Sequence, residues 1–475
     1  MGMRRAGTAR FALVAMATAV MPAVAQGPCD TRIPPPDVVP AVAFGTSVAV
    51  DGDFWFISDL NARVLCPGIF GCTSGAVHVY EMVDGQLEFM QMITPPVPRL
   101  GDAFGGVLDT HGGRLIVGSR LQEWPGLAAR GGAFVYEFDG AQWALTSTIR
   151  PPEGVDPRLA DKLGSFVTIE GNTAYLNPEG EEIVFAFELE DDAWAFDQMI
   201  ESPDGLPGSA RFGSRVVPDD PWLFINAPED STAVDRGGSV YVFRRQPDGS
   251  ITFHQKLMPF DAPGGVESNQ FFGVDVGHHQ GTLAIGAYGA MRGGVGTGAV
   301  LTYELVDDAW TFKQELLPPP SSQDDALGLP VTVREDVILA TATLARTPTT
   351  HDSLHYFKRG HDGMWKHAAE LIPEVPFFSD HYASSHAIRN GVAVVGAMGD
   401  SDGMGEYPGA AYQFDLSCFD CRPDFDADGA LTIFDFLTFL NLFEDGDAAA
   451  DFDSDGELTI FDFLAYQDAF DAGCE

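Results

Sequence analysis

Basic residues are scarce in this chain. Its 27 lysines and arginines stand against 69 aspartates and glutamates, which gives a formal net charge of -42. Only five of its 475 residues are lysine. A chain this acidic offers little positive surface to a nucleic-acid backbone or to an anionic membrane. The composition therefore argues against both partners and favours calcium or cationic ligands.

Long hydrophobic runs are also missing after residue 25, where no segment approaches the roughly 18 apolar residues of a membrane-spanning helix. Residues 1–25 carry Arg4, Arg5 and Arg10 and then an apolar stretch that ends in Ala-Val-Ala. This is the pattern of a secretory signal peptide. We therefore expect a secreted protein, extracellular or associated with the cell surface, without a transmembrane segment.

Common catalytic motifs are absent as well. The sequence has no His-Glu-x-x-His helix, no Gly-x-Ser-x-Gly elbow and no phosphate-binding glycine loop. Histidines gather between residues 351 and 386, but His351 and His355 on one strand would stand about 13 Å apart, too far to share a zinc ion. The remaining candidates for ligand contact lie in the longer loops, and we expect most of them to be solvated. They are Trp124, Arg130, Asp230, Arg236, Arg292, Asp400, Asp402, Glu406 and Tyr407.

A repeated unit of roughly 55 residues fills the chain between residues 41 and 417. Each unit has a Phe-Gly start or a variant of it, an apolar run, a run such as Gly238-Ser-Val-Tyr-Val-Phe243, and a tight acidic turn. Four short strands per unit are typical of a propeller blade. We therefore predict a mainly β fold, a seven-bladed β-propeller over residues 26–417. The seven units begin at Phe44-Gly45, Phe104-Gly105, Leu163-Gly164, Phe212-Gly213, Phe272-Gly273, Leu327-Gly328 and Tyr382-Ala383.

The Phe-Gly starts and the Gly-x-Val-Tyr-x-Phe runs resemble the FG-GAP repeats of integrin α-subunit propellers and their bacterial relatives. The resemblance covers nearly all of residues 29–417. In the integrins several blades bind calcium between strands one and two, whereas this chain has a short turn there, such as Glu170-Gly-Asn172. We therefore expect no calcium in the propeller. We also expect the propeller to be monomeric and its loop face to bind a protein or a glycan.

The seventh unit lacks a fourth strand. Residues 29–36, Cys-Asp-Thr-Arg-Ile-Pro-Pro-Pro, resemble the fourth strands of other units, so we expect them to complete blade seven and close the ring. In an antiparallel pair the end of strand three lies beside the start of strand four, which places Cys418 next to Cys29. Six cysteines in an exported chain favour disulfides, and fifteen pairings are formally possible. The strand argument selects Cys29–Cys418, Cys66–Cys72 and Cys421–Cys474.

Two near-identical blocks, residues 424–437 and 451–464, lie close to the C-terminus. Both follow the pattern of a calcium loop, with oxygen ligands at positions 1, 3, 5, 7, 9 and 12 and glycine at position 6. The sequence therefore predicts two calcium ions. The ligands of the first loop are Asp424, Asp426, Asp428, Ala430, Thr432 and Asp435, and those of the second are Asp451, Asp453, Asp455, Glu457, Thr459 and Asp462.

Each loop closes with aspartate where an EF-hand has glutamate, and an apolar helical pattern follows it without an entering helix before it. This arrangement resembles a type I dockerin, the module that attaches secreted bacterial proteins, often polysaccharide-degrading enzymes, to cohesin domains. The resemblance covers residues 421–475 and implies a small α-helical domain, residues 418–475, that binds a cohesin-like or other extracellular protein. Positions 10 and 11 carry recognition in dockerins, which implies that Ile433, Phe434, Ile460 and Phe461 contact the partner.

These expectations lead to two functional hypotheses. The first is a secreted, non-catalytic binding or scaffold protein whose propeller binds a protein or glycan and whose C-terminal module attaches it to a partner. The alternative is a polysaccharide hydrolase or lyase with a propeller catalytic domain and a dockerin. The absence of a catalytic motif favours the first hypothesis, and the sequence leaves the second open.

Overall fold

The fold is known from a computed structural model of the chain. The predicted signal peptide of residues 1–25 lies outside the described residues. Within the described part of the chain, no helix has both the length and the apolar character needed to cross a membrane. The structure describes residues 29–37, 41–66, 69–206, 208–259, 268–319, 325–344, 352–360, 363–373, 381–400, 408–419, 423–425, 431–452 and 458–472.

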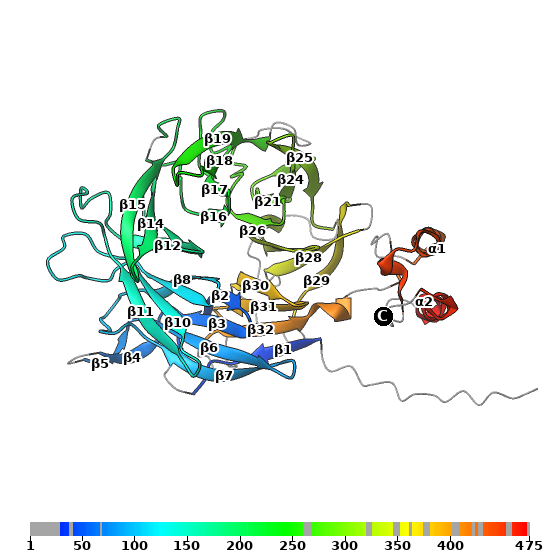
Figure 1. The fold of residues 1–475 in the computed structure, drawn as a ribbon, viewed down its shortest axis with the longest axis horizontal. Coiled ribbons are helices and arrows are strands. Elements are labelled where there is room, and N and C mark those ends of the chain that lie inside the picture. Colours follow the sequence, from blue (N-terminus) through cyan, green and yellow to red (C-terminus); the bar gives the residue numbers. More distant parts are fainter. Residues whose placement is uncertain are drawn as a thin grey trace, which may run out of the picture.

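Seven four-stranded antiparallel sheets form a ring (Figure 1), which confirms the predicted seven-bladed propeller. Each blade uses its first strand for the inner wall of the ring. Blade one consists of β2 (Phe44–Asp51), β3 (Phe54–Asp59), β6 (Ala76–Val83) and β7 (Gln86–Ile93), and blade two of β8 (Phe104–His111), β9 (Arg114–Ser119), β10 (Ala133–Phe138) and β11 (Trp143–Ile149). Blade three consists of β12 (Leu163–Glu170), β13 (Thr173–Pro178), β14 (Ile183–Glu190) and β15 (Ala193–Glu201). Blade four consists of β16 (Val216–Asp219), β17 (Trp222–Ala227), β18 (Ser239–Arg245) and β19 (Ile251–Leu257).

The remaining blades follow the same plan. Two small hairpins project from blades one and five. Blade five consists of β20 (Val276–His279), β21 (Thr282–Gly286), β24 (Val300–Val306) and β25 (Ala309–Leu316). Blade six consists of β26 (Asp325–Arg334), β27 (Val337–Leu344), β28 (Ser353–Arg359) and β29 (Trp365–Leu371). Blade seven consists of β30 (Tyr382–Arg389), β31 (Val392–Ala397), β32 (Ala410–Asp415) and β1 (Asp30–Ile33). The hairpins pair β4 (Arg63–Cys66) with β5 (Ile69–Thr73), and β22 (Met291–Arg292) with β23 (Val295–Gly296).

The hydrophobic core lies between neighbouring sheets. Strand β17 is buried along its whole length, as expected for a strand covered on both faces. Phe224 of β17 belongs to the same cluster as Phe272, Leu283 and Leu301 of the next blade. In contrast, β15 and β19 on the outer edge expose many side chains to solvent. The apolar runs of the sequence therefore bind each blade to the next.

The Phe-Gly starts and the third-strand glycines contact each other across blade boundaries. Gly238 of blade four forms a parallel bridge with Phe272, which begins blade five, and Gly409 of blade seven does the same with Phe44 of blade one. Gly238 has a φ of +80°, and a Cβ atom there would overlap the backbone of Phe272. Glycine is required because the two backbones approach too closely for a side chain.

The N-terminal segment closes the ring as predicted. Strand β1 pairs antiparallel with β32, so that Asp30 lies opposite Phe414 and Ile33 opposite Ala411. Cys29 and Cys418 form a disulfide with their Cα atoms 5.8 Å apart. Blade seven is thus built from both ends of the propeller sequence, which leaves no unpaired strand at the closure.

Two helices form the C-terminal region, α1 (Ile433–Asp445) and α2 (Ile460–Ala472), with short 3-10 turns at Leu416–Phe419 and Ala448–Ala450. Phe439 of α1 stacks on Tyr466 of α2 with ring centroids 4.1 Å apart. Phe425 and Phe452 complete this small core. Only part of each apolar helix face packs into it. Ile433, Phe434, Leu437, Ile460, Phe461 and Leu464 stay exposed.

Candidate active site in the central channel

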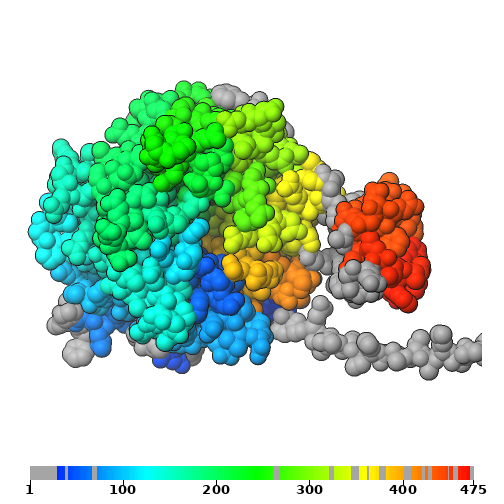
Figure 2. All heavy atoms as spheres, in the orientation of Figure 1, coloured from blue at the N-terminus to red at the C-terminus, as the bar shows by residue number. Residues whose placement is uncertain are grey.

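A cavity of about 480 Å³ lies in the channel at the centre of the ring. Figure 2 shows the surface hollowed there, between the blades coloured blue, green and orange. All of the inner strands contribute to the lining. This volume is in the range of small-molecule sites. The lining includes several ionisable residues, namely Asp109, His111, Glu170, Arg215, His278, Arg334 and His386.

Arg215 connects several of these groups. Its Nε lies 2.6 Å from Oδ1 of Asp275, which is almost fully buried. Oδ2 of Asp275 also accepts the backbone N–H of Val331 at 2.8 Å. Burial raises the pKa of Asp275, and the charge of Arg215 opposes that rise. The aspartate thereby fixes the guanidinium beside the cavity, although the Arg215 side chain keeps 35% of its surface exposed.

Asp109, on the inner strand of blade two, is a second carboxyl group beside the cavity. Its Oδ2 accepts hydrogen bonds from the Thr168 hydroxyl and, at 2.9 Å, from the backbone N–H of Ile169. Burial raises the pKa of Asp109, while these hydrogen bonds and the charge of Arg215 oppose the shift. A carboxyl whose pKa is raised exchanges protons closer to neutral pH, which suits general acid–base chemistry.

His386 of blade seven is the third titratable group near Arg215. Its Nδ1 lies 2.9 Å from the hydroxyl of Thr332 on blade six. Burial lowers the pKa of His386 to about 4, and the charge of Arg215 contributes to the shift. At neutral pH the ring is therefore uncharged. Arg215 thus interacts with Asp109, Asp275 and His386 from three different blades.

The loop residues singled out in the sequence form a different pattern. Most of the described ones form ion pairs with nearby loops or strands: Arg130 with Asp161, Asp230 with Lys256, and Arg236 with Glu229. Arg292 pairs with Glu315, and Asp400 with Arg32. Trp124 donates its indole N–H to the Gly131 carbonyl at 2.7 Å. Asp402, Glu406 and Tyr407 lie outside the described residues.

Two of the clustered histidines do meet. Nδ1 of His355 lies 3.0 Å from Nε2 of His367, and Nε2 of His355 lies 3.1 Å from the Ser353 hydroxyl. Burial lowers the pKa of His355 to about 3. Within the described ranges, no group of three or more histidine, cysteine, aspartate or glutamate side chains is placed to hold a metal ion. His351 and His361 lie outside those ranges.

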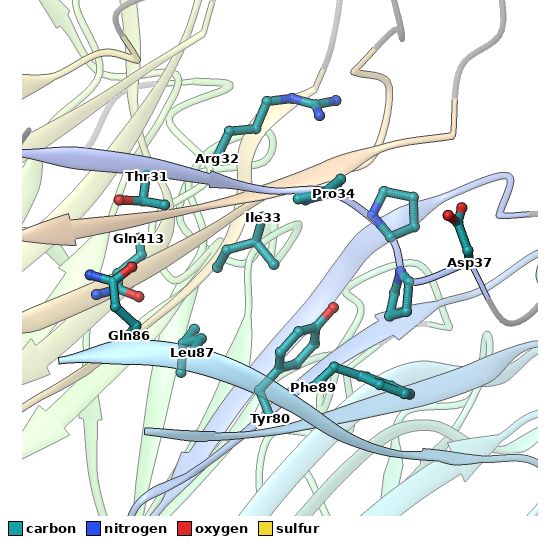
Figure 3. Close-up of a pocket in the computed structure, with 12 residues that line it drawn as sticks. Thr31, Arg32, Ile33, Pro34, Asp37, Tyr80, Gln86, Leu87, Phe89 and Gln413 are labelled. Carbon is teal, nitrogen blue, oxygen red and sulfur yellow. The ribbon is translucent and has the colours of Figure 1, made fainter. Parts of the chain in front are cut away.

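A second hollow follows the ring closure and lies between β1 and the outer strands of blade one (Figure 3). Its volume is about 520 Å³. Ile33, Pro34 and Phe89 line it, and the Arg32 side chain points away from it in Figure 3 and pairs with Asp400 at 2.9 Å. The hollow offers fewer ionisable groups than the central cavity and is a weaker candidate for chemistry.

The predicted calcium loops are described in part. Asp435 and Asp462 are fully buried at the first turns of α1 and α2. Asp435 accepts the backbone N–H of Thr432 at 2.8 Å, and Asp462 accepts that of Thr459 at 2.7 Å. Asp424 and Asp451 are also described. Asp426, Asp428, Ala430, Asp453, Asp455 and Glu457 lie outside the described residues.

The other predicted sites show a similar division. Cys66 and Cys72 form a disulfide with Cα atoms 5.9 Å apart, whereas Cys421 and Cys474 lie outside the described residues. The expected partner-binding residues are exposed, with 61% of Ile433 and 65% of Phe434 accessible. Ile460 and Phe461 are each 63% accessible. The two helices therefore present equivalent apolar surfaces to solvent.

Comparisons with known proteins find similarity in structure but not in sequence. No protein-family model and no curated protein sequence matches the chain. A periplasmic gluconolactonase from Pseudomonas aeruginosa is similar in structure, with 14% identity over 70% of this chain and 85% of that one and a TM-score of 0.41. A protein from Bacteroides fragilis described as a candidate 6-phosphogluconolactonase gives 12% identity, 69% and 84% coverage and a TM-score of 0.42.

The two neighbours carry the names of lactone-hydrolysing enzymes, which corrects the prediction of a non-catalytic binding or scaffold protein. Their resemblance to this chain is one of fold alone.

Sequence reasoning missed Asp109, Arg215 and Asp275. Each lies in or directly before an inner strand whose other residues are largely apolar, so the repeat pattern does not set them apart. Their charge could have revealed them in the sequence. Burying an ionisable side chain in a strand costs free energy, so such a residue is expected to be paired or functional.

Proposed function

We propose that the chain is an exported hydrolase that opens small, polyhydroxylated lactones in its central cavity. The observation that carries the proposal is the position of Arg215, whose guanidinium is held by the buried Asp275 and lines the same cavity as Asp109 and His386. A fixed cation beside a carboxyl group of raised pKa matches the needs of ester hydrolysis, which must stabilise an oxyanion and move a proton.

The assignment of roles follows from this chemistry. A water molecule attacks the lactone carbonyl carbon while the carboxylate of Asp109 accepts its proton. Arg215, held by Asp275, stabilises the negative charge that develops on the carbonyl oxygen. The ring C–O bond then breaks, and the proton returns from Asp109 to the departing alkoxide oxygen. The product is a hydroxy acid, and His386 and Thr332 are polar contacts for the hydroxyl groups of the substrate.

A continuous assay tests this proposal. The hydroxy acid ionises at neutral pH, so a pH indicator reports turnover directly when the purified full chain is mixed with a panel of sugar lactones. We expect hydrolysis above the spontaneous rate for at least one lactone, with saturation. Rates equal to the spontaneous rates across the panel would overturn the proposal.

We further propose that residues 418–475 are a dockerin-like module that binds two calcium ions and attaches the enzyme outside the cell to a cohesin-like or other extracellular protein. The position of Asp435 and Asp462 supports the calcium assignment, because each is a buried carboxyl group at the twelfth position of a loop with calcium-ligand spacing. When bound, calcium would supply the compensating charge. The exposed residues Ile433 and Phe434, with Ile460 and Phe461, support a docking role.

We also propose that the propeller is built from FG-GAP-like repeats. The Phe-Gly start of one blade contacts the third-strand glycine of the blade before it, so the two repeated motifs together specify the contact between successive blades.

Titration of the full chain with calcium, followed by calorimetry, tests the C-terminal module independently of the enzyme. Two binding events are expected, and their absence would contradict the calcium assignment.

A further inference from the structure

One mouth of the central channel is ringed by ionisable residues. The seven inner strands lie side by side in the order of the blades, and they run in the same direction. Their last residues therefore meet at the same end of the channel. These residues are Asp51, His111, Glu170, Asp219, His279, Arg334 and Arg389, in blade order. The acidic members belong to blades one, three and four, and the two arginines to blades six and seven.

The two arginines are unusual in this acidic protein. Other arginines, such as Arg215 and Arg245, are bound by carboxylates. In the described part of the structure neither Arg334 nor Arg389 forms an ion pair, although acidic residues are abundant. The Nε atom of Arg389 is buried without a hydrogen-bond partner among the described atoms. Arg334 lines the cavity, and Ile388, next to Arg389, does so as well.

His279 of blade five extends this sector. Its Nε2 is also buried, and no described group is hydrogen-bonded to it. Burial lowers the pKa of His279, and the charge of Arg334 lowers it further, whereas the charges of Glu335 and Asp219 oppose the shift. More than 90% of buried polar groups in folded proteins have a partner. Among the described residues, unsatisfied nitrogens of His279 and Arg389, on blades five and seven, together with the unpaired guanidinium of Arg334 between them, therefore indicate a missing acceptor with several oxygens.

The acidic sector, which adjoins His279 at blade four, has the complementary character. Glu170 lines the cavity, and its Oε1 accepts the backbone N–H of Asp220 at 3.2 Å. Asp219 lies 3.2 Å from Nδ1 of His278. Burial raises the pKa of both carboxyl groups. These side chains accept hydrogen bonds from hydroxyl groups, whereas the arginine sector offers donors.

We propose that the mouth of the channel is a binding subsite for a sugar acid, with Arg334, Arg389 and His279 holding its carboxylate. Guanidinium groups bind carboxylates through two parallel hydrogen bonds, and the acidic sector accepts the ring hydroxyls. This inference rests on the proposed function and names its substrate class: the lactone carries a second, free carboxylate in addition to the ester that is opened. A neutral sugar satisfies only the acidic sector.

Two ligands that differ in one group test the subsite. D-Glucuronate and D-glucose share a ring and differ at the carboxylate, and neither contains a lactone. We expect calorimetry with the purified full chain to show D-glucuronate binding at least 10-fold more tightly than D-glucose. We expect Arg334→Gln and Arg389→Gln each to lose on the order of 10-fold or more in D-glucuronate affinity, since each removes a charged hydrogen-bond donor.

Arg63→Gln provides the matched control, because Arg63 is exposed on the β4–β5 hairpin, away from the channel, and has no ion pair in the described structure. Its affinity for D-glucuronate should not change. Arg389→Lys covers the case in which Arg389→Gln does not fold, and it should lose affinity while keeping the charge. Equal affinity of the wild type for the two sugars, or unchanged binding in Arg334→Gln, would overturn the subsite. Lactone hydrolysis by the wild type is measured separately, so the two proposals fail independently.

Discussion

Cys29 and Cys418 are 389 residues apart in the sequence and are joined by a disulfide that locks β1 onto β32. The propeller therefore has no free end at its closure. A cross-link over so long a segment removes much conformational freedom from the unfolded chain. The closure also fixes the positions of blades one and seven, which both line the central cavity.

The first prediction concerns this disulfide. Cys29→Ser combined with Cys418→Ser should lower the free energy of unfolding by about 2–5 kcal/mol, because the unfolded chain regains the freedom of a long loop. Urea unfolding followed by tryptophan fluorescence measures the change. Cys66→Ser with Cys72→Ser is the control, since that bridge closes a loop of only six residues and should cost less. Equal losses in the two double variants would contradict the account of closure.

The second prediction concerns contact between blades. Gly238→Ala should destabilise the protein by about 3–5 kcal/mol, because it combines left-handed backbone strain with overlap against Phe272. Gly249 has a similar φ of +87°, but no atom lies within 4 Å of the position that a Cβ would occupy, so Gly249→Ala should cost only about 1–2 kcal/mol. Thermal melting of the two variants separates overlap from strain. A similar cost at both positions would show that the close approach is unimportant.

The third prediction concerns acid stability. His78 is buried, packs 5.3 Å from the Phe44 ring, and has no hydrogen-bond partner for either ring nitrogen in the described structure. Burial lowers its pKa from 6.5 to about 4. The unfolded state therefore binds the proton first as the pH falls, and stability is lost between pH 6.5 and about 4. This single group accounts for up to about 3 kcal/mol of that loss.

His78→Phe removes the titrating group and keeps an aromatic ring in the cluster. Its unfolding free energy should fall less steeply than that of the wild type between pH 6.5 and 4. His381→Asn is the control, because His381 is exposed and has a φ of +45°, a conformation that asparagine tolerates. Parallel pH profiles for wild type and His78→Phe would refute the assignment.

The fourth prediction concerns calcium. Asp435→Ala removes the buried carboxyl group that we propose as a ligand of the first loop, and should abolish one of two calcium-binding events in calorimetry of the full chain. Asp445→Ala, at the exposed C-terminal end of α1, should leave both events intact. A chelator should lower the helical signal of the wild type. Loss of neither binding event in Asp435→Ala would refute the ligand assignment.

The sequence was sufficient for the architecture, because each structural feature of the repeat is local. Phe272-Gly273 and Gly238 both stand out as repeated motifs, and the structure adds that they touch each other. Cys29 and Cys418 could be paired because the missing fourth strand left one antiparallel neighbour. The order of strands within a blade was enough to predict this disulfide.

The cavity could not be predicted in the same way. Asp109 and Arg215 come from different blades, and their proximity depends on the closure of the whole ring. The inner strands also change register, as between Phe104 and Leu108, so alternation along the sequence does not state which residues line the channel. The polar loops are prominent in the sequence, yet Arg130 and Asp230 stabilise neighbouring loops instead.

The most direct test of the central claim is the hydrolysis rate of Asp109→Asn on the lactone that the wild type turns over fastest. Asparagine keeps the shape of the side chain and cannot accept the proton from water, so kcat should fall by about 100-fold to 10,000-fold. Asp139→Asn, in an exposed turn of blade two, should match the wild type. An Asp109→Asn variant as active as Asp139→Asn would contradict a catalytic role for the central cavity.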